Sequence, residues 1–218
     1  MIMVTEQKPL DEIMQMLESY KSIYVIGCGT CATMLHTGGK SEVDELCKAL
    51  KESGKNIAGW MVIPTACDEL SEDALNRNAA DIKKADCIIV LSCAFGVQTI
   101  AMHTDKRVFP GLNTLFMGKE EPLGSITEVC IQCGNCVLDR TAGVCPVISC
   151  AKSLFNGPCG GSVNGKCEVS PDIPCAWQLI IDRLSALGQL DELEKIQPIK
   201  DWSTSSSGLP RRINLRKE

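Results

Sequence analysis

Two hydrophobic patterns alternate along the first 125 residues of the chain. Short runs of aliphatic and β-branched residues predict four buried strands: 22–27, 56–64, 86–92 and 107–110. Apolar residues at helical spacing predict the helices. The first covers residues 9–19, and the second covers residues 41–53 and ends at Gly54. Ser71 caps the third at its N-terminus, and the fourth is a stretch through Val97, Ile100 and Ala101.

The alternation of strands with helices determines the predicted fold class. Strands that are apolar on both faces are typical of a parallel sheet with helices packed on it. We therefore predict an α/β domain over residues 1–125, built as a flavodoxin-like doubly wound parallel sheet. In such sheets the ligand site lies beyond the carboxyl ends of the strands.

Four cysteines stand just after the ends of the predicted strands. Cys28 and Cys31 follow the strand at 22–27, Cys67 follows the second strand and Cys93 follows the third. Because parallel strands end at the same edge of a sheet, we expect these thiols to lie together. Four thiols in one place favour a four-cysteine metal site over four unrelated buried cysteines.

Other interpretations of this region are weaker. The loop G-C-G-T-C-A-T (27–33) has glycines and hydroxyls that would suit a phosphate cradle, but two thiols inside it suit a metal better. Cys47 and Cys87 differ from the other four, because they fall inside a helix face and inside a strand. We assign both to core packing.

A second cysteine-rich region occupies residues 130–175. It contains eight of the fourteen cysteines: Cys130, Cys133, Cys136, Cys145, Cys150, Cys159, Cys167 and Cys175. The first three are spaced C-x2-C-x2-C and Cys145 precedes a proline, as in the binding loop of bacterial ferredoxins. Eight residues separate Cys136 from Cys145, where the ferredoxin pattern has three. The triplet favours an iron–sulfur cluster over zinc, since three ligands reach three corners of one compact object.

Eight cysteines suffice for two four-thiolate sites. Cys130, Cys133 and Cys136 are expected to share one site, whose fourth ligand is Cys145 unless that residue crosses to the other site. The second site then draws on the remaining cysteines: Cys150, Cys159, Cys167 and Cys175. Spacing does not decide which cysteine crosses over, and one of the two sites could bind zinc. In all, we expect two or three [4Fe-4S] clusters.

The remaining sequence completes the domain organisation. Residues 176–188 carry apolar positions at helical spacing and close a cysteine-rich domain over 126–197. Residues 198–218 have low hydrophobicity, repeated serine and a basic end, so they are predicted not to fold by themselves. This extended tail is either a docking arm that orders on a partner or a solvated tail.

Composition excludes several function classes. A net charge of −5 argues against a nucleic-acid-binding protein, and no apolar run is long enough for membrane insertion. The N-terminus has acidic residues where a signal peptide would be basic, so we expect a cytoplasmic protein whose cysteines are metal ligands rather than disulfides. His36 and His103 have no evident partner, and no acid–base set is apparent. The chain alone is not expected to catalyse a reaction.

The motifs of the cysteine-rich region resemble those of a known family. They are C-x2-C-G-x-C-V-L-D-x-T-A-G-x-C-P, C-x-K-S-L-F-N-G-P-C-G-G, N-G-K-C-E-V and C-A-W-Q-L-I-I-D-R-L. They resemble the methylenetetrahydrofolate reductase C-terminal family. Nearly the full length is similar to the MetV-type iron–sulfur subunits of that reductase complex in acetogenic bacteria.

The resemblance implies a role in one-carbon metabolism and acetogenesis. It implies a heteromeric complex in which a larger subunit holds FMN and folate and reduces 5,10-methylenetetrahydrofolate. This chain would relay electrons from a donor protein to that flavin. One alternative is a zinc-stabilised scaffold subunit of the same complex without a redox role. Another is a chain that carries its own flavin in the α/β domain.

Overall fold

The structure is a computed structural model that describes residues 1–205, apart from the side chain of Leu123. The chain divides into two compact units, Met1–Glu120 and a second unit that begins at Glu121, and each is described by itself. The first unit contains β1 (Ile2–Gln7), α1 (Leu10–Met16), β2 (Ser22–Cys28), α2 (Cys31–Met34), α3 (Lys40–Glu52), β3 (Asn56–Ile63), α4 (Ser71–Arg77), α5 (Ala79–Lys84), β4 (Cys87–Leu91), α6 (Ala94–Met102), β5 (Arg107–Pro110) and β6 (Leu112–Glu121).

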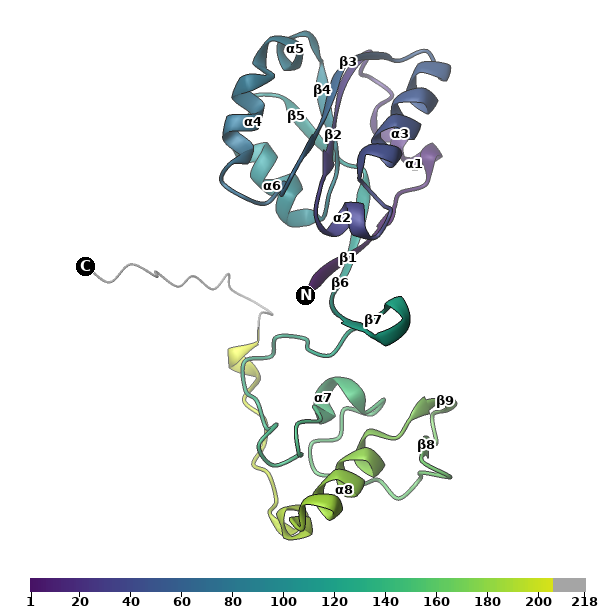
Figure 1. Cartoon of the computed structure of the whole chain (residues 1–218), viewed down its shortest axis with the longest axis vertical. Helices are drawn as coiled ribbons and strands as arrows, with labels where there is room; N and C mark the ends of the chain where they lie inside the picture. Colours follow the sequence, from purple (N-terminus) through teal and green to yellow (C-terminus); the bar gives the residue numbers. More distant parts are fainter. Residues whose placement is uncertain (206–218) are drawn as a thin grey trace, which may run out of the picture. The chain divides into compact units, whose positions relative to one another are not determined.

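A four-stranded parallel sheet forms the centre of the first unit. Its strand order is β3-β2-β4-β5, and helices cover both faces, with α1 and α3 on one side and α4, α5 and α6 on the other (Figure 1). This confirms the predicted α/β fold with a parallel sheet. In order of appearance along the chain, the strands lie 2-1-3-4, which is how the first four strands of a flavodoxin-like sheet are arranged.

Burial explains why the two central strands were recognisable as continuous apolar runs. From Ile23 to Cys28 every residue of β2 is buried, and so is every residue of β4. Helices pack on both faces of these strands, so no position faces water. Tyr24 is only 1% exposed, and burial raises the pKa of its hydroxyl to about 12.

Two features of the first unit differ from the sequence-based expectations. An antiparallel pair of strands, β1 with β6, was not predicted, because half of its positions are polar or charged and only scattered ones, such as Ile2 and Thr5, are buried. Ser71 was predicted to cap a helix, and this is wrong. Leu70 is the N-cap of α4, while the Ser71 hydroxyl donates a hydrogen bond to the Ala66 carbonyl oxygen at 3.0 Å.

The second unit has little regular structure. It contains a one-turn helix (Pro122–Gly124), β7 (Ser125–Thr127), α7 (Pro146–Ser149), β8 (Lys166–Cys167), β9 (Ser170–Pro174), α8 (Ala176–Leu187) and two short 3₁₀ helices (Leu190–Glu194 and Trp202–Thr204). The helix predicted at 176–188 is therefore confirmed, and Gly188 ends it in the left-handed conformation. The buried core that α8 provides is small, comprising Trp177, Ile180 and Leu184. A unit with so little buried apolar surface needs another source of stability.

None of the helices in the described part of the chain has the length and apolar composition needed to cross a membrane.

The burial of Cys47 and Cys87 agrees with their assignment to the core, and Cys87 provides a test. Its side chain is fully buried, and burial raises the pKa of its thiol to about 11. We expect Cys87→Ser to lower the free energy of unfolding by about 1–3 kcal/mol, because the hydroxyl is a stronger polar group in an apolar site. Urea unfolding measures this change. Cys87→Ala is the control for lost volume, and neither variant should lose metal; metal loss would contradict the core assignment.

Candidate metal centres

The first candidate centre lies where the strands of the parallel sheet end. Cys28 is the last residue of β2, Cys31 begins α2, and Cys93 is the N-cap of α6 directly after β4. Cys67 lies in the loop between β3 and α4. Cys28 and Cys93 are buried, Cys31 is half-buried and Cys67 is exposed. The sheet thus places all four on the edge that the sequence predicted.

The charges of these four thiols affect one another. Although Cys67 is exposed, loss of water around its sulfur raises its pKa, and the charges of Cys93, Cys28 and Cys31 raise it further. Electrostatic coupling falls with distance, so Cys67 lies near the other three thiols. Four thiolates in one region repel each other unless a cation neutralises them.

The surroundings of Cys28 favour its thiolate form. Burial acts to raise its pKa, but hydrogen bonds from Thr30, from Ser92 and from the Ala66 backbone outweigh burial, so the pKa is lowered. The Thr30 hydroxyl lies 3.4 Å from the Cys28 sulfur. Hydrogen-bond donors around a sulfur are typical of metal–thiolate sites.

The second candidate centre is a small cavity in the second unit. Cys150, Cys159, Cys167 and Cys175 all line it, together with Lys152, Ser162, Glu168 and Trp177. The cavity volume is about 10 Å³. The cysteines come from the end of α7, from the glycine-rich loop, from β8 and from the residue that precedes α8. These are the four cysteines that were assigned from the sequence to the second site of this region.

The polar groups around this cavity include a hydrogen-bond donor to sulfur, an ion pair and a hydroxyl without a partner. The Gly161 backbone N–H donates a hydrogen bond to the Cys159 sulfur at 3.5 Å. Lys152 and Glu168 form an ion pair at its wall. Within the described residues, the buried Ser162 hydroxyl oxygen has no hydrogen-bond partner. A buried polar atom without a partner, beside four free thiols, is compatible with a bound ion.

The third candidate centre is the loop that carries the cysteine triplet. Cys130 and Cys136 are exposed, whereas Cys133 is 8% exposed. The Gln132 backbone N–H donates to the Cys130 sulfur at 3.4 Å. Burial acts to raise the pKa of Cys133, but hydrogen bonds from the Asn135 backbone and from Lys200, together with the positive charge of Lys200, outweigh it and the pKa is lowered.

The structure does not decide the fourth partner of the triplet. Cys145 is the half-buried N-cap of α7 and is not among the residues that line the cavity of Cys150 and Cys159. All fourteen cysteines are free thiols. Within residues 1–205, no group of three or more His, Cys, Asp or Glu side chains stands in a geometry that could hold a metal ion directly. The cysteines are therefore gathered into sets without forming coordination shells.

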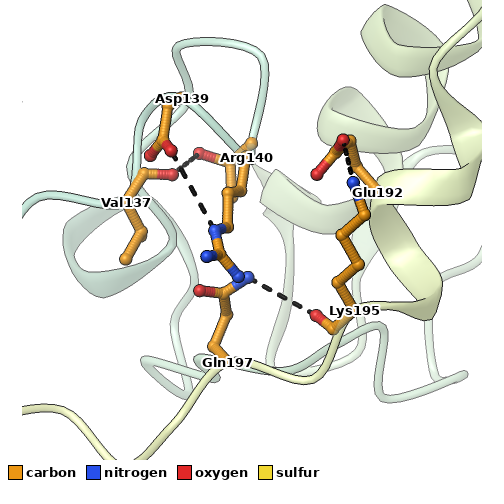
Figure 2. Close-up of polar contacts among 7 residues, drawn as sticks. Val137, Asp139, Arg140, Glu192, Lys195 and Gln197 are labelled. Carbon is orange, nitrogen blue, oxygen red and sulfur yellow. Dashed lines mark hydrogen bonds and ion pairs between the residues drawn. The ribbon is translucent and has the colours of Figure 1, made fainter.

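Sequence reasoning missed the segment that follows α8. Residues 198–205 belong to the predicted tail, yet Lys200 is only 7% exposed. Figure 2 shows how the chain enters this segment: the Lys195 side chain pairs with Glu192, and the Gln197 amide donates to the Lys195 carbonyl oxygen at 3.4 Å. The rest of the predicted tail, residues 206–218, lies outside the described residues. A lysine two residues before Trp202 was the only signal in the sequence.

The histidines do not add a catalytic set. His36 is exposed on the turn after α2. The expectation that His103 has no partner is wrong, because its Nδ1 lies 3.8 Å from a carboxylate oxygen of Glu72. Glu72 lies in α4 and His103 is the C-cap of α6. The sequence around either residue therefore does not predict that the two side chains are neighbours.

Comparison with known proteins gives one match. No curated protein and no solved structure matches the chain. Residues 109–203 match the model of a protein family described as methylene-tetrahydrofolate reductase C terminal. The matched stretch contains the eight cysteines of the second unit but not Cys28, Cys31, Cys67 or Cys93. In its second unit the chain is similar to the methylenetetrahydrofolate reductase C-terminal family, and this similarity relates the protein to that reductase.

Proposed function

We propose that the chain is an electron-transfer subunit that relays electrons through iron–sulfur clusters to the flavin subunit of a methylenetetrahydrofolate reductase complex. The observation that carries this proposal is the placement of Cys28, Cys31, Cys67 and Cys93 at the carboxyl edge of the sheet. The family match supports it by relating the second unit to the reductase. The finer assignment, a MetV-type subunit of an acetogenic pathway in the cytoplasm, rests on the sequence resemblance.

The donor chemistry of the first centre fits an iron–sulfur cluster. Four thiols suit a [4Fe-4S] cluster because each of its four irons takes one thiolate. Such a cluster supplies one-electron transfer when bound. Cys28 and Cys93 would hold it from the buried side, while the exposed Cys67 would lie on the side open to a partner. The hydroxyls of Thr30 and Ser92 stabilise the thiolate of Cys28.

The triplet loop fits a cluster for similar reasons. Cys133 has a lowered pKa, so its thiolate is formed readily. The Gln132 N–H already points at the Cys130 sulfur, and such donors stabilise charge on cluster ligands. Cys145 is the proposed fourth ligand, since the other four cysteines of this unit line a separate cavity.

The cavity of Cys150, Cys159, Cys167 and Cys175 favours a single ion. A volume of about 10 Å³ is roughly that of one water-sized sphere, which is too small for a cubane of eight core atoms. Zinc binds four thiolates and stabilises small domains with little core. We propose zinc in this site and clusters in the other two. The alternative, a zinc scaffold without a redox role, would place zinc in all three.

The proposed relay has two kinds of partner. The flavin-bearing reductase subunit would accept the electrons, and a separate donor protein would supply them. The reduction of folate is assigned to the flavin subunit, as the sequence resemblance implies. The tail 198–218 remains the proposed docking arm, and its residues 206–218 lie outside the described residues.

Metal analysis of the anaerobically purified chain tests the proposal. We expect a brown protein with about eight irons, bleached by dithionite, and about one zinc. No flavin should be released on denaturation. A colourless protein that contains zinc alone would support the scaffold, and a yellow supernatant would indicate a flavin of its own.

The first centre has its own prediction. Cys67→Ser should lower the iron content by about four atoms per chain and remove one cluster signal, because one ligand of a four-thiolate site is lost. Iron in the second unit should remain. Cys47→Ala is the matched control, since Cys47 is a buried cysteine of the same unit. Unchanged iron in Cys67→Ser would show that Cys67 is not a ligand.

The small cavity gives a separate prediction. Cys159→Ser should reduce zinc from about one per chain to background and lower the melting temperature of the second unit, because a structural metal contributes folding free energy. The iron content should not change. Val169→Ser is the control, because this exposed residue follows Glu168 in the same hairpin region. Loss of iron instead of zinc would show that the cavity expands to take a cluster.

A further inference from the structure

Lys200 is a buried cation beside the triplet loop. Its side chain is only 7% exposed, whereas lysines are seldom buried unless something compensates their charge. Among the described residues, no carboxylate forms an ion pair with its ammonium group. The neighbouring Asp201 accepts hydrogen bonds from the Ser203 hydroxyl and backbone N–H at 2.6 and 2.9 Å; these bonds lower the pKa of its carboxyl, and the charge of Lys200 lowers it further without forming an ion pair.

The contacts of Lys200 orient its ammonium group towards the cysteines. The Lys200 Nζ donates a hydrogen bond to the Asn135 carbonyl oxygen at 3.0 Å, between Cys133 and Cys136 in the sequence. The aromatic rings of Trp202 and Phe155 flank it, with centroids at 5.1 and 6.0 Å. These rings stabilise the cation without neutralising it.

The same ammonium group reaches Cys133. The Lys200 ammonium group lies on the Asn135 carbonyl oxygen, two residues after Cys133, and the nearby positive charge helps to lower the pKa of the Cys133 thiol, which favours the thiolate. Cys133 is the member of the triplet with the least exposed surface. An interaction of this kind favours negative charge on the sulfur and on whatever the sulfur binds.

Three further hydrogen bonds attach the segment around Lys200 to the protein. The Gln197 N–H donates to the Asn156 side-chain oxygen at 2.7 Å, and the Asn156 amide donates back to the Gln197 carbonyl oxygen at 3.0 Å. At the other end, the Thr204 hydroxyl donates to the Cys133 carbonyl oxygen at 2.9 Å. Gly134, with a φ of +78°, lies against Thr204, where a side chain would collide with the Thr204 backbone. The segment 197–204 is thus fixed across the triplet loop.

We propose that Lys200 is a positioning residue for the centre held by Cys130, Cys133 and Cys136, and that its charge raises the reduction potential of that centre. This inference rests on the proposed function, because it requires an iron–sulfur cluster on these thiolates. Reduction adds one negative charge to the cluster. A fixed positive charge beside one ligand stabilises the reduced form more than the oxidised form, so the potential rises.

The experiment is a redox titration of the full chain, purified anaerobically and followed by electron paramagnetic resonance. The variants are Lys200→Met, which removes charge and donor; Lys200→Gln, which keeps a donor without charge; and Lys200→Arg, which keeps the charge. The control is Lys195→Met, which removes an exposed lysine five residues earlier that pairs with Glu192. Iron content is measured for each.

For Lys200→Met and Lys200→Gln we expect the reduction equilibrium of one cluster to fall at least tenfold, which is about 59 mV for a one-electron couple. Lys200→Arg and Lys195→Met should keep the potential of the unmodified chain. Equal potentials in Lys200→Met and the unmodified chain, at equal iron content, would overturn the proposal. A shift in Lys200→Met that is absent from Lys200→Gln would overturn it as well, since the donor rather than the charge would then be responsible.

Loss of the cluster in a Lys200 variant would also test the proposal. If Lys200→Met and Lys200→Gln lack the cluster and Lys200→Arg retains it, the requirement for a cation at this position is supported. Loss in Lys200→Arg too would contradict it. An unmodified chain without iron would instead refute the proposed function, which the same metal analysis shows before any variant is made.

Discussion

Parallel pairing of β2 with both β3 and β4 is the constraint on which the first unit depends. Cys28 is in register with Ile63, and Gly27 is in register with Leu91, so the three strands end at one level. The loops that leave this level carry the other cysteines of the set. Buried aliphatic side chains fix the register of these strands. The same register therefore places cysteines from distant parts of the chain at one edge of the sheet.

The second unit reaches a similar arrangement without a sheet. Its one buried apolar cluster among the described residues centres on three residues of α8, and its cysteines are held on loops and at the ends of short elements. Glycines give these loops their turns, and backbone N–H groups of Gln132 and Gly161 point at sulfur. In the first unit apolar burial positions the thiols, whereas in the second the thiols would bind a metal that takes over part of the role of a core.

The sequence was informative where one physical effect dominates. Fully buried strands such as β2 and β4 show continuous apolar runs, so the sheet and the edge that carries Cys28 and Cys93 could be predicted. The pair β1–β6 could not, because its few buried positions stand among charged ones. Ser71 looked like a cap, but a tertiary hydrogen bond to Ala66 determines its role. Lys200 depends on contacts with residues more than 40 positions away, which no local pattern contains.

The distance along the chain between Lys200 and the loop it contacts has a consequence for biosynthesis. Asn135 and Lys200 are separated by 65 residues, so the ribosome releases the triplet loop well before the lysine that holds it. Chains generally fold as they emerge, in N-terminal to C-terminal order. The first unit can therefore form while synthesis continues, but the surroundings of Cys133 are incomplete until Lys200 has been translated. The loop that carries the triplet thus waits on the ribosome for the residue that fixes it.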